Sequence, residues 1–175
     1  MSHTTKKAQT IMSDFSIGLA IFLVTVFVAF NIYGDMKETK SLKYDISDIN
    51  LEINSISNKL IRSKGYPENW NKNNVLDIGW EQDYPLLNTT KLNYTTQLTY
   101  SQLKDLLKTN YDFQINITYK NGSIYKINQT PLSYGTSLNI TSSILSHVSR
   151  IAYIESDNKR IPVSINVYMW KNRIL

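Results

Sequence analysis

The most apolar part of this chain lies close to its N-terminus. Nineteen consecutive residues, from Phe15 to Tyr33, carry no charged side chain. As an α-helix rising about 1.5 Å per residue, this stretch would be about 28 Å long, which is close to the hydrocarbon thickness of a bilayer. The pattern predicts a membrane-spanning helix over residues 15–33.

Two alternatives for this stretch fit less well. A cleaved secretory signal has a shorter apolar region of about 7–15 residues and ends at small residues, which Ala29-Phe30-Asn31 does not offer. A core helix of a small domain is normally apolar on one face, whereas this stretch is apolar all round and lies near the chain end.

A second apolar pattern follows the predicted span. Apolar side chains recur at spacings of three and four, so the helix is expected to continue as an amphipathic segment over residues 34–64. Gly65, followed by Pro67, is typical of a helix C-terminus. The apolar stripe either packs on the chain's own sheet or forms a coiled coil with another chain. Its members are Leu42, Ile46, Ile49, Ile53, Ile56 and Leu60.

The remaining residues, 65–175, are predicted to be rich in β-strands. Apolar and polar residues alternate over 111–119 and 161–170, as expected for half-buried strands. Asn121-Gly122 is a strong signal for a hairpin turn. Pro162 is expected at a strand start or a sheet edge, because proline cannot donate to a ladder.

The other elements of this region have weaker signals. A helix capped by Thr99 or Ser101 is expected to end near Lys108. Residues 81–96 are expected to be irregular. Further strands are expected over 74–80, 124–127 and 147–155.

These patterns predict an α+β fold, in which one long N-terminal helix packs on an antiparallel β-sheet. A sheet with one apolar face needs a cover, and the amphipathic stripe can supply it. The chain has 175 residues, enough beyond the span for one domain. We expect a cytoplasmic tail (1–14), a transmembrane helix (15–33), an extracellular amphipathic helix (34–64) and an extracellular β-rich domain (65–175).

Charge sets the expected topology. Lys6 and Lys7 precede the span, whereas the charges at 35–40 cancel, so the N-terminus is expected in the cytoplasm and the C-terminal domain outside. The formal net charge is +5, but the basic residues are scattered rather than gathered in a run, so we expect no nucleic-acid partner.

Asn-x-Ser/Thr acceptors for N-linked glycans agree with this orientation, because such sites are modified on the exported side of a membrane. All of them fall in the predicted extracellular domain. The candidates are Asn88, Asn93, Asn116, Asn121, Asn128 and Asn139, and Pro131 is expected to weaken the site at Asn128.

The sequence offers little for catalysis. It contains no cysteine, so disulfides and thiolate chemistry are excluded. Its two histidines, His3 and His147, are expected on opposite sides of the membrane. Neither nucleotide-binding nor hydrolase motifs occur. We therefore expect a protein that is not an enzyme and that needs no cofactor or metal.

Two N-terminal motifs carry a resemblance to a known family. Lys7-Ala8-Gln9 resembles a prepilin peptidase site after a short charged leader, and Asp14 resembles an acidic position at the start of the following helix. Residues 65–79, with Gly65-x-Pro-x-x-Trp70 and a later Ile78-Gly79, resemble a stretch that follows the long helix in that family. The chain thus resembles archaeal type IV pilin-like proteins with class III signal peptides.

The resemblance implies a pilin-like fold and a structural subunit, pilin or minor pilin-like, of a surface filament that polymerises through the N-terminal helix, with a possible role in adhesion. Its partners would be the membrane, other pilin-like subunits and a prepilin peptidase. Cleavage before Gln9 would leave Asp14 as the sixth residue of the mature chain, where pilins usually have Glu as the fifth. Asp14 either pairs with a neighbouring subunit's terminal amine or lies at the lipid headgroups. The alternative function is a non-polymerising, single-pass surface protein with an adhesive or sensory ectodomain.

Overall fold

The chain divides into two compact units. The computed structural model describes residues 3–138, 144–156 and 159–171, and of residues 3–14, 35 and 37–42 it describes the backbone only. The first unit is Met1–Tyr44 and the second is Asp45–Leu175, which we call the head. Helix α1 (His3–Arg62) contributes residues to both units. Each unit is described by itself.

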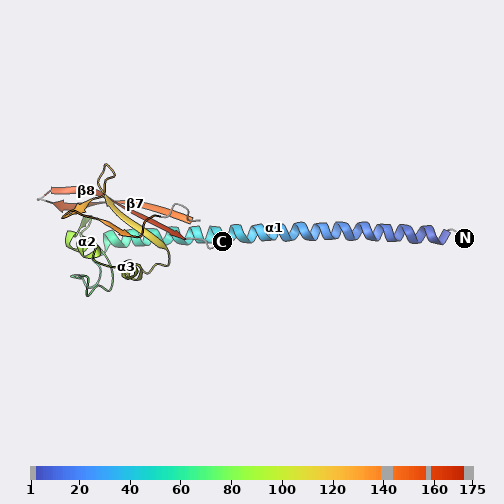
Figure 1. The fold of residues 1–175 in the computed structure, drawn as a ribbon, viewed down its shortest axis with the longest axis horizontal. Helices are drawn as coiled ribbons and strands as arrows, with labels where there is room; N and C mark the ends of the chain where they lie inside the picture. The colour runs from blue at the N-terminus through green and yellow to red at the C-terminus, as the bar shows by residue number, and fades with distance from the viewer. Residues whose placement is uncertain (1–2, 139–143, 157–158, 172–175) are drawn as a thin grey trace. The chain divides into compact units, whose positions relative to one another are not determined.

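The head is an α+β structure built around a curled, mostly antiparallel sheet (Figure 1). Six strands pair in the order β1-β2-β7-β8-β3-β6, and β4 and β5 form a separate two-stranded sheet. Only β2 and β7 among the described strands pair in parallel. The strands are β1 (Glu81–Asp83), β2 (Leu86–Leu87), β3 (Asp112–Thr118), β4 (Lys126–Ile127), β5 (Thr130–Pro131), β6 (Ser133–Gly135), β7 (Ile144–Ser156) and β8 (Lys159–Lys171).

The centre of the sheet confirms the alternation in the sequence. Along β3, Phe113, Ile115 and Ile117 are buried while the residues between them are half-buried. On β8 the same alternation runs from Val163 to Met169. The two strands pair antiparallel from Asp112↔Trp170 to Thr118↔Ser164, so their apolar side chains form one continuous inner face.

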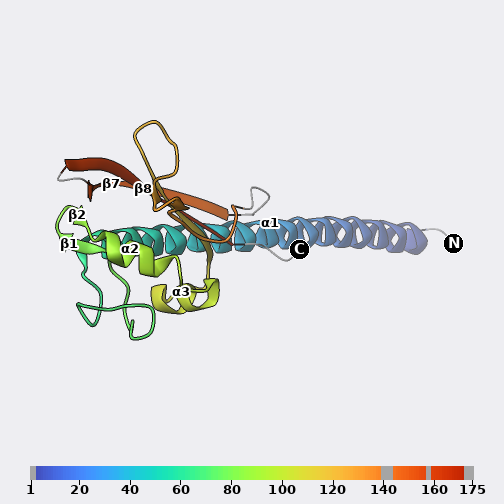
Figure 2. The ribbon, with the colours of Figure 1, turned by 60° about the vertical axis from the view of Figure 1, so that its left-hand side comes forward.

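The predicted helical stripe covers this face. Ile49, Ile53, Ile56 and Leu60 are at most 4% exposed, so the stripe packs within the chain's own head. Ile46 is 47% exposed and stays outside this core, and the side chain of Leu42 lies outside the described residues. Figures 1 and 2 show the sheet on one side of this part of α1, with α2 (Thr89–Thr95) and α3 (Tyr100–Leu107) on the other.

A polar seam joins the same helix to β7. Asn54 Oδ1 and Asn58 Oδ1 accept hydrogen bonds from the Arg150 guanidinium, at 2.7 Å from Nη2 and 3.4 Å from Nε. One turn earlier on α1, Asn50 Oδ1 accepts from Ser146 Oγ at 2.6 Å. The spacing of four residues places the three asparagines on one side of the helix. The seam fixes the register of α1 along β7.

Helix α3 matches its prediction closely. Thr99 is its N-cap, and Thr99 and Gln102 form a reciprocal capping box. Lys108 ends the helix in the left-handed conformation, with φ of 57°. Leu103 and Leu107 are buried.

Two sequence predictions between α1 and α3 are wrong. Residues 74–80 form no strand beyond one isolated bridge, Tyr66↔Asp77. The backbone amides of Trp80 and Glu81 instead bond to carbonyls at the end of α1, those of Leu60 and Ser63. Residues 81–96 are not irregular, since they contain β1, β2 and α2.

The segment after β3 also differs from its prediction. The turn at Asn121-Gly122 is present, closed by the amide of Gly122 bonding to the carbonyl of Tyr119. However, the expected return strand pairs with β3 only through one bridge, Thr118↔Ile124, and then turns back on itself as β4 and β5. Asn128 and Gln129 form this second turn with positive φ, as a two-residue hairpin loop requires.

Pro162 lies where no ladder hydrogen bond is required from it, as expected, but in a strand inside the sheet. Strand β8 lies inside the sheet, but its pairing with β3 ends at Ser164. Pro162 therefore pairs only with Tyr153 of β7 and lies at a local edge on its other side.

Candidate functional site

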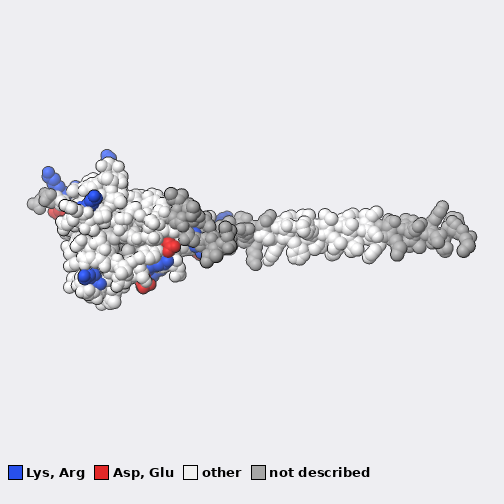
Figure 3. All heavy atoms as spheres, viewed as in Figure 1, with Lys and Arg blue, Asp and Glu red and all other residues white. Residues whose placement is uncertain are grey.

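The first candidate site is the apolar stretch of α1. Phe15–Gly34 has a mean hydropathy of 2.4 and none of it is buried, so it can cross a membrane, as a signal sequence near an N-terminus also could. Phe15 and Phe30 are each more than 70% exposed. Figure 3 shows no charged side chain on the visible face of this stretch. Such complete exposure argues against a core helix and calls for an apolar cover.

Two polar side chains of this stretch, those of Thr25 and Asn31, bond back to the backbone of the helix. Thr25 Oγ1 donates to the carbonyl of Ile21 at 2.8 Å, and Asn31 Nδ2 donates to the carbonyl of Phe27 at 2.7 Å. Polar groups that bond back to their own helix can enter lipid without leaving a donor unpaired. Thr25 and Asn31 are therefore compatible with an apolar surrounding.

The predicted processing residues lie near the beginning of α1. The backbone of Lys7, Ala8, Gln9 and Asp14 is helical. Their side chains lie outside the described residues, so processing and the charge pairing of Asp14 stay predictions.

The six glycan acceptors occupy different local structures. Asn88 is the N-cap of α2, where its Oδ1 accepts from the amide of Lys91 at 3.1 Å, and Asn93 lies within that helix. Asn116 is half-buried in the middle of β3. Asn121 and Asn128 are exposed, each in a turn. The sixth acceptor, Asn139, lies outside the described residues.

Residues 65–79, which carry the third part of the family resemblance, close the end of α1. Trp70 is 1% exposed, and its indole Nε1 donates to the carbonyls of Lys64 and Gly79, both at 3.1 Å. A side chain at Gly65 would collide with the Trp70 ring, and one at Gly79 with the carbonyl of Ser63. The conspicuous residues of this segment are thus needed for packing.

Lys91 also contacts the residues that follow the end of α1, and no pattern in the sequence indicated this role. Its Nζ donates to the carbonyl of Lys64 at 2.5 Å and lies 6.0 Å from the centre of the Trp70 ring. Burial lowers the pKa of the Lys91 ammonium, while the charge of Glu68 acts in the opposite direction. A cation close to the C-terminus of a helix interacts favourably with the partial negative charge of that end, and Lys91 lies just beyond the end of α1.

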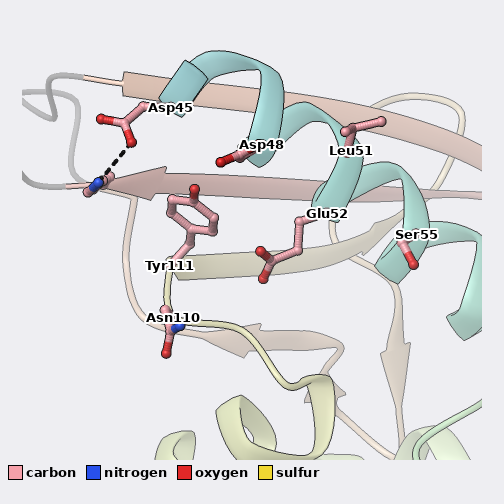
Figure 4. A pocket seen from close by; sticks show the side chains of 8 residues that line it. Asp45, Asp48, Leu51, Glu52, Ser55, Asn110 and Tyr111 are labelled. Carbon is pink, nitrogen blue, oxygen red and sulfur yellow. Dashed lines mark hydrogen bonds and ion pairs between the residues drawn. The ribbon is translucent and has the colours of Figure 1, made fainter. Parts of the chain in front are cut away.

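A hollow of about 680 Å³ lies where α1 meets the start of β3 and the end of β8 (Figure 4). Three carboxylates from successive turns of α1 face it, those of Asp45, Asp48 and Glu52. Lys171 pairs with Asp45 at 3.0 Å. Burial raises the pKa of Tyr111, and the charge of Glu52 raises it further.

This hollow has the character of an acidic surface depression. Glu52 Oε1 is shielded from solvent and has no hydrogen-bond partner within the described residues. Over the described parts of the chain, no group of three or more histidine or carboxylate side chains is placed to hold a metal ion. His147 instead stacks on Tyr168, with the ring centres 4.3 Å apart.

Comparison with known proteins places the chain in a family. No curated protein and no solved structure matches it. A family model described as a family of unknown function, DUF7287, matches residues 5–170, which include nearly all of α1 and of the head. The chain therefore belongs to the DUF7287 family.

Proposed function

We propose that this chain is a structural subunit, a pilin or minor pilin-like protein, of an archaeal surface filament. In this proposal the subunit is first inserted in the cell membrane by residues 15–34, with its N-terminus in the cytoplasm and the head outside. It then enters a filament through the same apolar surface. A role of this kind requires no catalytic centre and no cofactor.

One observation carries the proposal. The two apolar parts of α1 differ in what covers them. Ile49, Ile53, Ile56 and Leu60 are buried in the head, whereas none of the span at Phe15–Gly34 is buried. An apolar helix surface of this size needs lipid or other apolar helices around it. Contacts between subunits therefore fall on residues 15–34, and the stripe of the head is not available for a coiled coil.

Processing connects the membrane form to the filament form. Cleavage before Gln9 by a prepilin peptidase would free the amine of Gln9 and make Asp14 the sixth residue of the mature chain. Within an apolar bundle, that carboxylate needs a positive partner, and the amine of a neighbouring subunit would supply one.

The second candidate function is a stationary, single-pass surface protein with an adhesive or sensory head. The offset of Asp14 by one residue from the usual acidic position favours it, because one residue turns a side chain by about 100° around a helix. In this case lipid alone would cover the span, and Asp14 would lie among the headgroups.

The mature N-terminus distinguishes the two functions. Surface filaments are sheared from cells, and the chain is analysed by intact-mass spectrometry in the sheared fraction and in membranes. We expect a chain that begins at Gln9 in the filaments. A chain that keeps its first eight residues and stays entirely in the membrane would contradict the filament role and support the stationary anchor.

An Asp14→Asn variant tests the pairing. The amide keeps the shape of the side chain but removes its charge, so the variant should insert into membranes and fail to enter filaments. Asp35→Asn, a change of the same kind just beyond the span, serves as the control and should assemble normally. Equal assembly of both variants would show that the charge of Asp14 has no role in assembly.

A further inference from the structure

The six glycan acceptors look alike in sequence, but their geometry separates them. Transfer of an N-linked glycan joins the asparagine Nδ2 to the anomeric carbon of a polyprenyl-phosphate-linked oligosaccharide. The bond from that carbon to the phosphate oxygen breaks, the phosphate leaves with the electron pair, and Nδ2 loses a proton. The enzyme that does this must reach both the amide and the hydroxyl two residues later, so both must be accessible together in a folded head.

The two acceptors at α2, Asn88 and Asn93, fail this requirement. Side chains two residues apart on a helix point in different directions, so Asn93, within α2, does not face the hydroxyl of Thr95. The hydroxyl of Thr95 is also inaccessible: Thr95 is 1% exposed, donates to the carbonyl of Lys91 and accepts from Trp80 Nε1. The side chain of Asn88 is held in place as the cap of α2.

Asn116 fails for a different reason. It shares one face of β3 with Thr118, but both side chains are engaged in the sheet. Asn116 Oδ1 accepts from Ser133 Oγ at 2.7 Å, and Thr118 Oγ1 accepts from Asn166 Nδ2 at 3.0 Å. Since β3 is paired with β8 on one side and β6 on the other, an enzyme cannot grip this segment as an extended peptide.

Asn121 meets the requirement. The amide and hydroxyl groups of its motif are in contact, because Ser123 Oγ and the Ser123 amide donate to Asn121 Oδ1, at 2.7 and 3.1 Å. Both residues are exposed, and the segment between β3 and β6 projects from the sheet as a loop (Figure 2). In this Asx-type turn the side-chain Oδ1 of Asn121 accepts both bonds from Ser123, so these contacts do not use the Nδ2 to which a glycan would be joined.

Asn128 lies on the same projecting segment but is less suited. It occupies the tight turn between β4 and β5 with φ of 48°, and Thr130 is already paired with Ile127 in that small sheet. Pro131 follows directly and stiffens the backbone on the hydroxyl side.

We infer that the folded head carries an N-linked oligosaccharide at Asn121 and not at the other four acceptors that the structure describes. The inference rests on the proposed function, since it requires the head to be outside the cell. The glycan would stand on the projecting segment, away from the stripe and the seam that hold the head together.

The test uses the full chain, expressed in archaeal cells that N-glycosylate exported proteins, with glycopeptide mass spectrometry of each acceptor. We expect a glycan at Asn121, lost in both Asn121→Gln and Ser123→Ala and retained in the matched variants Asn116→Gln and Thr118→Ala. A glycan on Asn88, Asn93, Asn116 or Asn128 of the folded chain, or an unmodified Asn121, would overturn the inference.

Two further measurements separate the possible causes of failure. Protease added to intact cells reports whether the head is outside: an external head without a glycan at Asn121 refutes only this inference, whereas an internal head refutes the proposed function as well. An Ile53→Asp variant, which should unfold the head, is expected to gain glycans at Asn93 or Asn116. An unchanged pattern in that variant would show that folding does not select the acceptor.

Discussion

At the scale of single residues, the most demanding positions are those that close the end of α1. A helix leaves its last carbonyls without partners, and here the Trp80 amide donates to the carbonyl of Leu60. The Trp70 indole and the Lys91 ammonium both donate to the carbonyl of Lys64, two residues beyond α1. This arrangement requires the backbone at residue 65 to pass very close to the Trp70 ring, and the backbone at residue 79 to pass very close to the carbonyl of Ser63. Gly65 and Gly79 permit that approach, the former with φ of 76°.

Gly79→Ala should therefore destabilise the head by at least about 1 kcal/mol. The added methyl carbon would lie 2.2 Å from the carbonyl oxygen of Ser63, so the backbone itself must move. Thermal unfolding of the full chain in detergent, followed by near-ultraviolet circular dichroism, measures the loss. Gly34→Ala is the control, since nothing lies within 4 Å of that position, and equal melting of the two variants would show that the close approach is unimportant.

Tyr100→Phe should produce a loss of stability that depends on pH. The Tyr100 hydroxyl donates to Asp112 Oδ1 at 2.7 Å, and this bond, opposed by burial and aided by Lys104, lowers the pKa of the Asp112 carboxyl. A carboxyl with a lowered folded pKa contributes stability above its ordinary pKa of about 3.9 and loses it as the pH falls through the folded value. We expect a cost of about 1 kcal/mol at pH 7, because the carboxylate is partly exposed.

Melting temperatures of the two proteins between pH 7 and pH 2 test this expectation. The difference between them should shrink below pH 4. Tyr66→Phe changes an exposed tyrosine and should show no such trend. A constant difference for Tyr100→Phe across the range would mean that the hydroxyl acts through packing and not through the carboxylate.

At the scale of elements, α1 has two apolar surfaces with separate partners. The surface in the head is narrow and is matched to the inner face of β3 and β8, with the asparagine seam beside it. The surface at Phe15–Gly34 extends all round the helix and has no partner within the described chain. The first forms part of the core of the head, and the second is apolar and exposed.

Ile53→Ala and Leu51→Ala should differ sharply in how much they destabilise the head, although the two positions lie only two residues apart. Ile53 is 0% exposed between α1 and the sheet, so its truncation should cost about 2–5 kcal/mol. Leu51 is 70% exposed, and its truncation should change stability by less than about 0.5 kcal/mol. Chemical denaturation of the full chain in detergent gives both values. A large cost for Leu51→Ala would mean that a further surface covers that side of α1.

The elements that could be predicted from sequence are those whose burial repeats over several turns or residue pairs. The alternation on β3 and β8 and the stripe from Ile49 to Leu60 each involve many positions, so a single irregular residue does not hide them. By contrast, β1 and β2 span three and two residues, too few to show a period. Helix α2 is rich in threonine, a weak helix former, and its start signal at Asn88 also belongs to a glycan motif.

The candidate sites, like the fold, could be predicted from the sequence only in part. The span and all six acceptor motifs are visible in the sequence, because each depends on a local pattern. What separates the acceptors depends on the fold: Thr95 is buried by Trp80, and Asn116 is flanked by β6 and β8. Contacts between distant segments, such as Lys91 with Lys64, leave no periodic signal in a single sequence.

At the scale of the whole molecule, the two units differ in what stabilises them. Every buried apolar residue of the described chain lies at Ile49 or beyond, so the head contains its own complete core. The first unit, up to Tyr44, contributes none of it. The stability of the head should thus not depend on the span, whereas its location in the cell should depend on the span entirely.

A chain restricted to residues 45–175 should accordingly be soluble without detergent and melt cooperatively, within a few degrees of the head in the full chain. It keeps Ile49 to Leu60, the asparagine seam and the Lys171–Asp45 pair, and it lacks the uncovered apolar surface. A chain restricted to residues 65–175 is the matched comparison. Without residues 45–64, the inner faces of β3 and β8 would be open to water. The loss of five buried apolar side chains (Ile49, Ile53, Ile56, Leu60 and Ile61), at about 1.5–3 kcal/mol each, exceeds what a domain of this size can tolerate. Size-exclusion chromatography and circular dichroism compare the two: cooperative folding of the shorter chain would show that α1 is a dispensable attachment, while aggregation of the longer one would show that the head depends on residues before Asp45.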